Sequence, residues 1–169
     1  MNNMALRSQL NGDLLVPDGQ IFRDIGRASA YFDATKYLKN QGISQGYDDA
    51  TFRPNEKMTR RDAVIFLSRA FGVQPQQNAY SPFVDVPTTD ASIGYVAALK
   101  AKGVIQSGLL FRPDDIVTKA ELIGLIIRLS GTKVAPVAQI SQEVAQITLF
   151  AKQTGYRITR FQASAVLTR

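Results

Sequence analysis

The sequence lacks several residue types that carry familiar chemistry. Among its 169 residues there is no cysteine, histidine or tryptophan. Disulfides, thiolate or imidazole zinc sites and histidine general bases are therefore excluded. No segment approaches the roughly 18 consecutive apolar residues of a membrane-spanning helix, so we predict no membrane span. Residues 1–16 also lack the continuous apolar core of a signal peptide, so any export signal is expected to have been removed.

The carboxylates offer no clear catalytic or metal site. Asp48 and Asp49 are adjacent, but the spacing of an EF-hand loop is absent, and we predict no metal. Paired carboxylates can hydrolyse glycosidic bonds, yet nothing distinguishes such a pair here from scattered surface acids. With no catalytic constellation, the sequence predicts neither an enzyme nor a cofactor.

The chain does have an excess of positive charge. Lys and Arg number 20 against 14 Asp and Glu, which gives a net charge of +6. Such a chain favours a polyanionic partner, and nucleic acid, an anionic glycan and an anionic membrane surface all qualify. Because the basic residues are spread along the chain and form no recognition motif, we predict no nucleic-acid partner.

A helix with a marked start and stop recurs along the chain. Thr59 is a candidate N-cap with acidic Asp62 three residues later, and Gly72 provides the stop. The same frame returns at Thr118 and again at Thr159. Three copies of one pattern predict a tandem repeat. One apolar face of the first copy is predicted to comprise Ala63, Phe66, Leu67, Ala70 and Phe71.

Each copy is predicted to be a helix–loop–helix unit, which makes the fold all-α. The third copy lacks the loop between its helices, because only three residues separate Gly155 from Thr159. The predicted segments are a leader (1–21), repeat 1 (22–72), a linker (73–82), repeat 2 (83–131), a second linker (132–139) and a degenerate repeat 3 (140–169).

The pattern also predicts burial. In repeat 1 a helix is expected near residues 29–41, with its inner face formed by Ala34, Tyr37 and Leu38. In repeat 2 the cap of the first helix is expected to be Asp90 or Ser92. The second helix of repeat 2 is apolar nearly all round, which predicts the most buried helix of the chain. The core is also expected to contain four phenylalanines at repeated positions: Phe22, Phe52, Phe83 and Phe111.

A basic residue follows the threonine in every copy: Arg60, Lys119 and Arg160. A cation in the first turn opposes the helix dipole and costs roughly 0.3–1 kcal/mol at an exposed site. An anion held by this residue and by the free N–H groups of the helix start would explain the recurrence. The alternative is a salt bridge to Asp24 or to a neighbouring repeat.

Further candidates lie in the repeat openings and loops. Ligand contact and capping of the turn before the first helix are equally open for Asp24 and Asp85. A pocket edge could be lined by Gly46, Tyr47 and Gly108, although turn geometry explains the glycines as well. A structural role is expected for the arginines of the last helical turns, Arg69 and Arg128, because the helix dipole favours them there.

The combined pattern resembles the S-layer homology (SLH) family. In repeat 1 the matching motifs are Phe22-Arg23-Asp24, Gly42-Ile43, the loop GYDDATFRP at 46–54, and Thr59-Arg60. In repeat 2 they are Phe83-Val84-Asp85, Gly103-Val104, Phe111-Arg112-Pro113 and Thr118-Lys119-Ala120-Glu121. The resemblance covers about residues 22–131 well and 140–169 loosely.

The resemblance implies a fold in which three repeats form a pseudo-threefold spindle around a central helix bundle. It also implies non-covalent anchoring of a bacterial surface protein to an anionic cell-wall polysaccharide, commonly one with pyruvate ketals. The location would then be the cell surface. The family's binding positions map onto Arg60, Asp24, Asp85 and, loosely, Arg160.

The chain departs from the family pattern in three ways. There is no tryptophan, although family members often place one early in the first helix. Lys119 replaces an arginine and loses the planar fork that holds a carboxylate through two bonds. The third copy has no loop. The leading hypothesis is a glycan-binding module in which Arg60 holds an acidic sugar substituent. The alternative is a degenerate unit for protein–protein assembly, including self-association in a surface layer.

Overall fold

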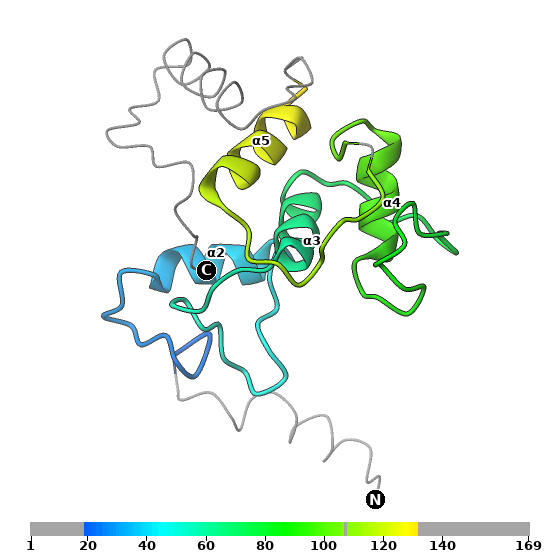
Figure 1. Ribbon diagram of the computed structural model, residues 1–169. Helices are drawn as coiled ribbons and strands as arrows, with labels where there is room; N and C mark the ends of the chain where they lie inside the picture. The colour runs from blue at the N-terminus through cyan, green and yellow to red at the C-terminus, as the bar shows by residue number, and fades with distance from the viewer. Residues whose placement is uncertain (1–18, 107, 132–169) are drawn as a thin grey trace, which may run out of the picture. The chain divides into compact units, whose positions relative to one another are not determined.

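The computed structural model describes residues 19–106 and 108–131 (Figure 1). Four α-helices lie in these ranges: α2 (Phe32–Asn40), α3 (Arg60–Ala70), α4 (Ile93–Ala101) and α5 (Lys119–Leu129). The described ranges contain isolated β-bridges but no strand. The all-α prediction is confirmed, while the pseudo-threefold arrangement stays a prediction. No helix within the described ranges is long and apolar enough to cross a membrane.

The chain divides into two compact units between Glu56 and Lys57. The first unit has a small core in which the rings of Phe22 and Phe52 pack with centroids 5.3 Å apart. Ile25 is also buried there, and half-buried apolar side chains surround the three: Ile21, Phe32 and Leu38. This unit therefore depends on few apolar contacts.

The buried face of α2 differs from the predicted one. Thr35 is buried, whereas Ala34 and Tyr37 are exposed. The inner face thus runs through Phe32, Thr35 and Leu38, about one residue from the predicted stripe. The Thr35 hydroxyl donates to the Phe32 carbonyl, so this polar residue is buried without losing a hydrogen bond.

In the second unit, α3 contacts both α4 and α5 and lies between them (Figure 1). The core of this unit joins Val64 of α3 to the residues before, within and after α4: Phe83, Val86, Val96, Leu99, Val104, Ile105 and Phe111. All four phenylalanines predicted for the core are buried. Because its core is larger, the second unit has more apolar contacts to stabilise it than the first.

Local signals placed the helix ends correctly. Thr59 accepts from the N–H of Asp62 and forms a capping box with it, and Thr118 does the same with Glu121. Gly72 follows α3 with a φ of 66°, a left-handed conformation that favours glycine. Such signals depend on neighbours in sequence, which is why they are readable without the fold.

Two further predictions of burial were wrong. In α3 the buried face is Ala63, Val64, Leu67 and Ser68, while Ala70 and Phe71 are exposed. The most buried described helix is α4 rather than α5, with five buried residues of nine against three of eleven. Burial depends on what packs against a helix, and in the described residues α5 contacts α3 but not α4.

Candidate functional site: a cationic cavity beside the second loop

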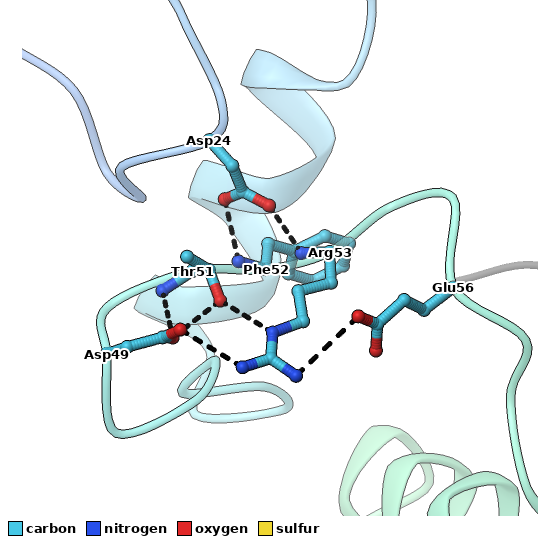
Figure 2. A network of polar contacts seen from close by, with 6 residues as sticks. All are labelled: Asp24, Asp49, Thr51, Phe52, Arg53 and Glu56. Carbon is cyan, nitrogen blue, oxygen red and sulfur yellow. Dashed lines mark hydrogen bonds and ion pairs between the residues drawn. The ribbon is translucent and has the colours of Figure 1, made fainter.

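In each of the two described repeats, an aspartate near the start holds the loop between the helices. In the first unit, Asp24 accepts from the N–H groups of Phe52 at 2.8 Å and Arg53 at 2.6 Å (Figure 2). Arg53 has a φ of 59°, which is costly for a residue with a side chain. The two charge-assisted hydrogen bonds offset that strain and fix the loop.

The second unit repeats this arrangement. Asp85 accepts from the N–H groups of Phe111 at 2.8 Å and Arg112 at 2.6 Å, and Arg112 has a φ of 58°. Burial alone would raise the pKa of Asp85, but the two N–H groups outweigh it and hold the pKa below its ordinary value. Asp24 and Asp85 thus cap a turn, though it is the loop turn and not the one before the first helix.

The outer part of the first loop carries a polar network (Figure 2). Asp49 accepts from the hydroxyl and N–H of Thr51 and pairs with Arg53 at 3.0 Å. These contacts, the Thr51 hydroxyl first, lower the pKa of Asp49 to about 2. The Arg53 guanidinium also lies 3.9 Å from the centroid of the Tyr47 ring.

Glycines in the two loops have different roles. Gly46 has a φ of 75°, and a Cβ there would lie 2.4 Å from the Phe22 ring. Packing and backbone conformation therefore require glycine at position 46. This agrees with the structural explanation that the sequence offered beside a pocket edge. A Cβ at Gly108 would meet nothing closer than 3.7 Å, so packing does not require glycine there. Gly108 instead lines a cavity.

This cavity measures about 230 Å³ and lies within the second unit. Arg60 and Val64 of α3 form one wall, and Glu121, Leu125 and Arg128 of α5 form another. The remaining lining comes from the loop and its surroundings: Phe83, Ile105, Gln106, Gly108, Leu110, Phe111 and Val117. An apolar floor thus faces two arginines and one carboxylate.

Arg60 is held rigidly at the cavity. Its Nε donates to the Phe111 carbonyl at 2.8 Å, and its Nη1 pairs with Glu121 at 2.5 Å. The guanidinium also lies 5.1 Å from the Phe111 ring centroid. Its Nη2 has no partner among the described residues, so a planar donor remains for a ligand. The two roles considered for Arg60 from the sequence were ligand contact and a salt bridge to a neighbouring repeat. The structure is compatible with both, because Arg60 forms that salt bridge and also lines a cavity.

The predicted role of the α3 helix start needs correction. The N–H of Arg60 donates to the Asp115 carbonyl at 2.8 Å, and the N–H of Arg61 donates to the Pro113 carbonyl at 2.9 Å. The N–H of Asp62 donates to the Thr59 hydroxyl. Because the chain itself satisfies these groups, an anion at this cavity would be held by side chains and not by the helix start.

Two further cavity residues were missed or assigned only a structural role. Glu121 was read as a capping residue, and its Oε2 does accept from Thr118, but its Oε1 accepts from Arg60 across 61 residues. Arg128 was expected to serve its own helix end. Its Nε donates to the Val104 carbonyl at 2.7 Å, which sets the side chain at the cavity. Arg128 follows Thr118 by ten residues, as Arg69 follows Thr59, but this repeated spacing does not reveal the long-range contact of Arg128.

Lys119 and Arg160 complete the set of predicted site residues. Lys119 is the first residue of α5, half-buried, and forms no ion pair with a described residue. Arg160 lies outside the described residues, as does the rest of the third copy. The structure therefore gathers Arg60 and Gly108 at one cavity and keeps Asp24, Gly46 and Tyr47 in a separate unit.

An ion pair between half-buried Arg61 and the buried carboxylate of Asp90 joins two helix starts of the second unit. Arg61 pairs with Asp90 at 2.9 Å, and the Asp90 side chain is only 3% exposed. Asp90 also accepts from the N–H and hydroxyl of Ser92, the N-cap of α4. Burial would raise the pKa of Asp90, but the Ser92 and Arg61 contacts outweigh it and lower that pKa. The start of α3 is thereby fastened to the start of α4.

Comparison with known proteins agrees with the repeat pattern. The model of the S-layer homology domain matches residues 21–64 and 82–123, which together are half of the chain. The chain is 24% identical over 111 residues to an S-layer protein of Bacillus licheniformis, covering 64% of the chain and 13% of the relative. It is 28% identical over 113 residues to a cellulosome-anchoring protein of Acetivibrio thermocellus, covering 63% and 25%.

An endo-1,4-beta-xylanase A of Thermoanaerobacterium saccharolyticum is also similar, with 28% identity over 121 residues that cover 71% of the chain and 10% of the relative. The chain thus spans a quarter or less of the relatives named here. The similarity therefore extends over only part of each relative. On the two matched repeats, the chain belongs to the S-layer homology domain family.

Proposed function

We propose that this chain anchors a protein to the bacterial cell surface by binding an acidic cell-wall polysaccharide at the cavity of Arg60. The proposal rests on the Arg60 guanidinium, which Phe111 and Glu121 hold in place while its Nη2 has no partner among the described residues. A donor held in place before binding loses little entropy when a ligand arrives.

The lining of the cavity fits a substituted sugar. Apolar side chains of Val64, Phe83 and Phe111 can cover the less polar face of a sugar ring. The two arginines outnumber the single carboxylate of Glu121, so the cavity favours a negative substituent, such as a pyruvate ketal. Asp85, which is not among the residues that line the cavity, is a further proposed acceptor from sugar hydroxyls, because each of its oxygens keeps a lone pair beyond the N–H that it binds.

The proposal assigns no catalytic role to the chain. Within the described residues, no group of three or more acidic side chains could hold a metal ion.

The net charge of +6 would draw an anionic polymer toward the surface of the protein. Binding at several repeats on one polymer would add avidity, and in that role we retain Asp24, Gly46, Tyr47, Lys119 and Arg160 as proposed contacts.

Sedimentation with purified cell walls tests this function. The wild-type chain is expected to sediment with intact walls and to stay in solution with walls stripped of acidic polysaccharide. Arg60→Ala should weaken binding by about tenfold or more, since a charge-assisted hydrogen bond contributes about 1.5–3 kcal/mol. Arg69→Ala is the matched control, because Arg69 lies on the same helix and carries the same charge but is exposed and does not line the cavity.

Equal binding to intact and stripped walls would contradict the proposal. Equal loss in Arg60→Ala and Arg69→Ala would reduce it to a general charge effect. Self-association that does not depend on the glycan, without wall binding, would support the assembly module instead.

A further inference from the structure

The arginine that follows Arg60 links three segments of the second unit. In the first turn of α3, the Arg61 guanidinium contacts one oxygen of Asp90 through Nε at 3.0 Å and through Nη2 at 2.9 Å. Its Nη1 pairs with Asp114 at 3.0 Å. Because Asp90 precedes α4 and Asp114 precedes α5, one side chain connects the start of α3 with the segments that lead into both other helices of the unit.

The helix itself does not require an arginine at this position. The same frame places Ala120 there in α5, which begins with a capping box as α3 does. A cation in the first helical turn opposes the helix dipole, so Arg61 is unfavourable for α3 taken alone. The reason for Arg61 therefore lies in what it connects and not in the helix that carries it.

The segment 111–115, which contains Asp114, also supplies part of the Arg60 site. The N–H of Arg61 donates to the Pro113 carbonyl at 2.9 Å, so both the backbone and the side chain of Arg61 bind this segment. At its beginning, Phe111 lines the cavity, and the Phe111 carbonyl accepts from Arg60 Nε at 2.8 Å. The direction of the Arg60 guanidinium thus depends on how the segment is held.

The two partners of Arg61 differ in burial. The Asp90 carboxylate is 3% exposed and also accepts from Ser92, so the contact toward α4 is anchored. The Asp114 carboxylate is 78% exposed, and a pair so open to water contributes little to stability. A planar guanidinium has separate N–H groups for two carboxylates and can bind both at once. The Asp114 contact therefore affects the position of the segment more than the free energy of unfolding.

We infer that Arg61 is a positioning residue for the cavity. Anchored on Asp90, its guanidinium holds the segment 111–115 against α3. The Phe111 carbonyl, which belongs to that segment, then keeps the Arg60 side chain at the cavity. The consequence for glycan binding rests on the proposed function, whereas the consequence for the Arg60 side chain does not.

Arginine side-chain NMR tests the positioning directly. Asp114→Asn removes the exposed partner of Arg61, and the Nε–H of Arg60 should then exchange with solvent about three- to fivefold faster, as expected for the loss of a half-exposed ion pair. Asp115→Asn is the matched control, because it removes the same charge from the next, also exposed residue, whose side chain pairs with Arg112. Equal exchange rates of Arg60 in the two variants would overturn the inference.

Binding and unfolding measurements separate positioning from a purely structural role. Asp114→Asn should bind acidic wall polysaccharide about three- to fivefold more weakly than Asp115→Asn, although urea unfolds both variants with the same free energy. Arg61→Lys keeps the charge but lacks the planar fork, so its Arg60 exchange and its binding should match those of Asp114→Asn. Binding that weakens only in proportion to lost stability would overturn the inference. A wild-type chain that binds no wall would contradict the proposed function, and the exchange rates of Arg60 would still decide the positioning role.

Discussion

The two loops of this chain share a scaffold and differ in what surrounds it. In each, an aspartate binds two successive N–H groups, a phenylalanine pair packs with centroids 5.3 or 5.7 Å apart, and a lysine lies over one ring. Beyond the scaffold, the first loop has the charged network around Asp49, whereas the second has exposed Leu109 and Leu110. The scaffold therefore sets the loop, and the flanking residues decide what it can bind.

The flanking helices complete the difference. The second loop meets Arg60 of α3 and the side chains of Glu121 and Arg128 on α5, and these side chains form the cavity. A motif that occurs twice thus need not mean two equal sites. The comparison predicts that scaffold substitutions act on stability in both loops, and that cavity substitutions act on binding.

The largest expected effect is loss of a scaffold aspartate. Asp85→Ala leaves two N–H groups without an acceptor and the strained Arg112 without its restraint, so stability should fall by about 2–4 kcal/mol. Asp24→Ala should cost a similar amount in the first unit. Urea unfolding followed by circular dichroism measures both. A loss below 1 kcal/mol at about pH 7 would show that the scaffold does not hold the loops.

The next effect concerns the buried carboxylate of Asp90 in the second unit. Asp90→Ala leaves the Arg61 side chain and the buried Ser92 hydroxyl without this acceptor, and should cost about 2–3 kcal/mol. The first unit should be unaffected, which amide hydrogen exchange can resolve residue by residue. Equal destabilisation of both units would mean that they unfold together.

The pH dependence of stability should follow the lowered pKa values of Asp85 and Asp90. A carboxylate whose folded pKa lies below the ordinary 3.8 contributes stability that is fully present above that value. The contribution is lost as the pH falls through the folded pKa. Unfolding free energy should therefore drop between pH 5 and pH 3, and Asp85→Asn should flatten the drop. An unchanged slope in that variant would contradict the assignment.

A smaller stability effect is expected at the cavity. The contacts of Arg60 with Phe111 and Glu121 predict that Arg60→Ala loses about 1 kcal/mol of stability. Thermal unfolding measures this loss and identifies the temperature range in which binding by the variant can be compared. An unchanged melting temperature would mean that the two contacts contribute nothing net.

The smallest effect is expected in the polar network of the first loop. Arg53 pairs with Asp49 and Glu56 at the surface, where such pairs contribute about 0–1 kcal/mol. Arg53→Lys should therefore lower the free energy of unfolding only slightly. Raising the salt concentration should abolish the remaining difference in stability between variant and wild type, because salt screens surface charges. A loss of unfolding free energy comparable to that of Asp24→Ala would contradict this, because it would show that the network is needed to hold the loop.

The sequence predicted what depends on near neighbours. Both described capping boxes, the glycine after α3 and the core phenylalanines were read correctly. The contacts of Arg60 could not be read in this way, because its partners Phe111 and Glu121 lie 51 and 61 residues away. The burial of α5 was misjudged for the same reason, since composition does not say which faces are covered.

The most direct test of the account is the dissociation constant of purified acidic wall polysaccharide for the wild-type chain and for Arg60→Lys at one ionic strength. The substitution keeps the charge and removes the planar fork, so the account predicts binding weaker by about tenfold. An equal dissociation constant for the two chains would show that Arg60 acts only as a point charge or lies outside the site, and would contradict the account.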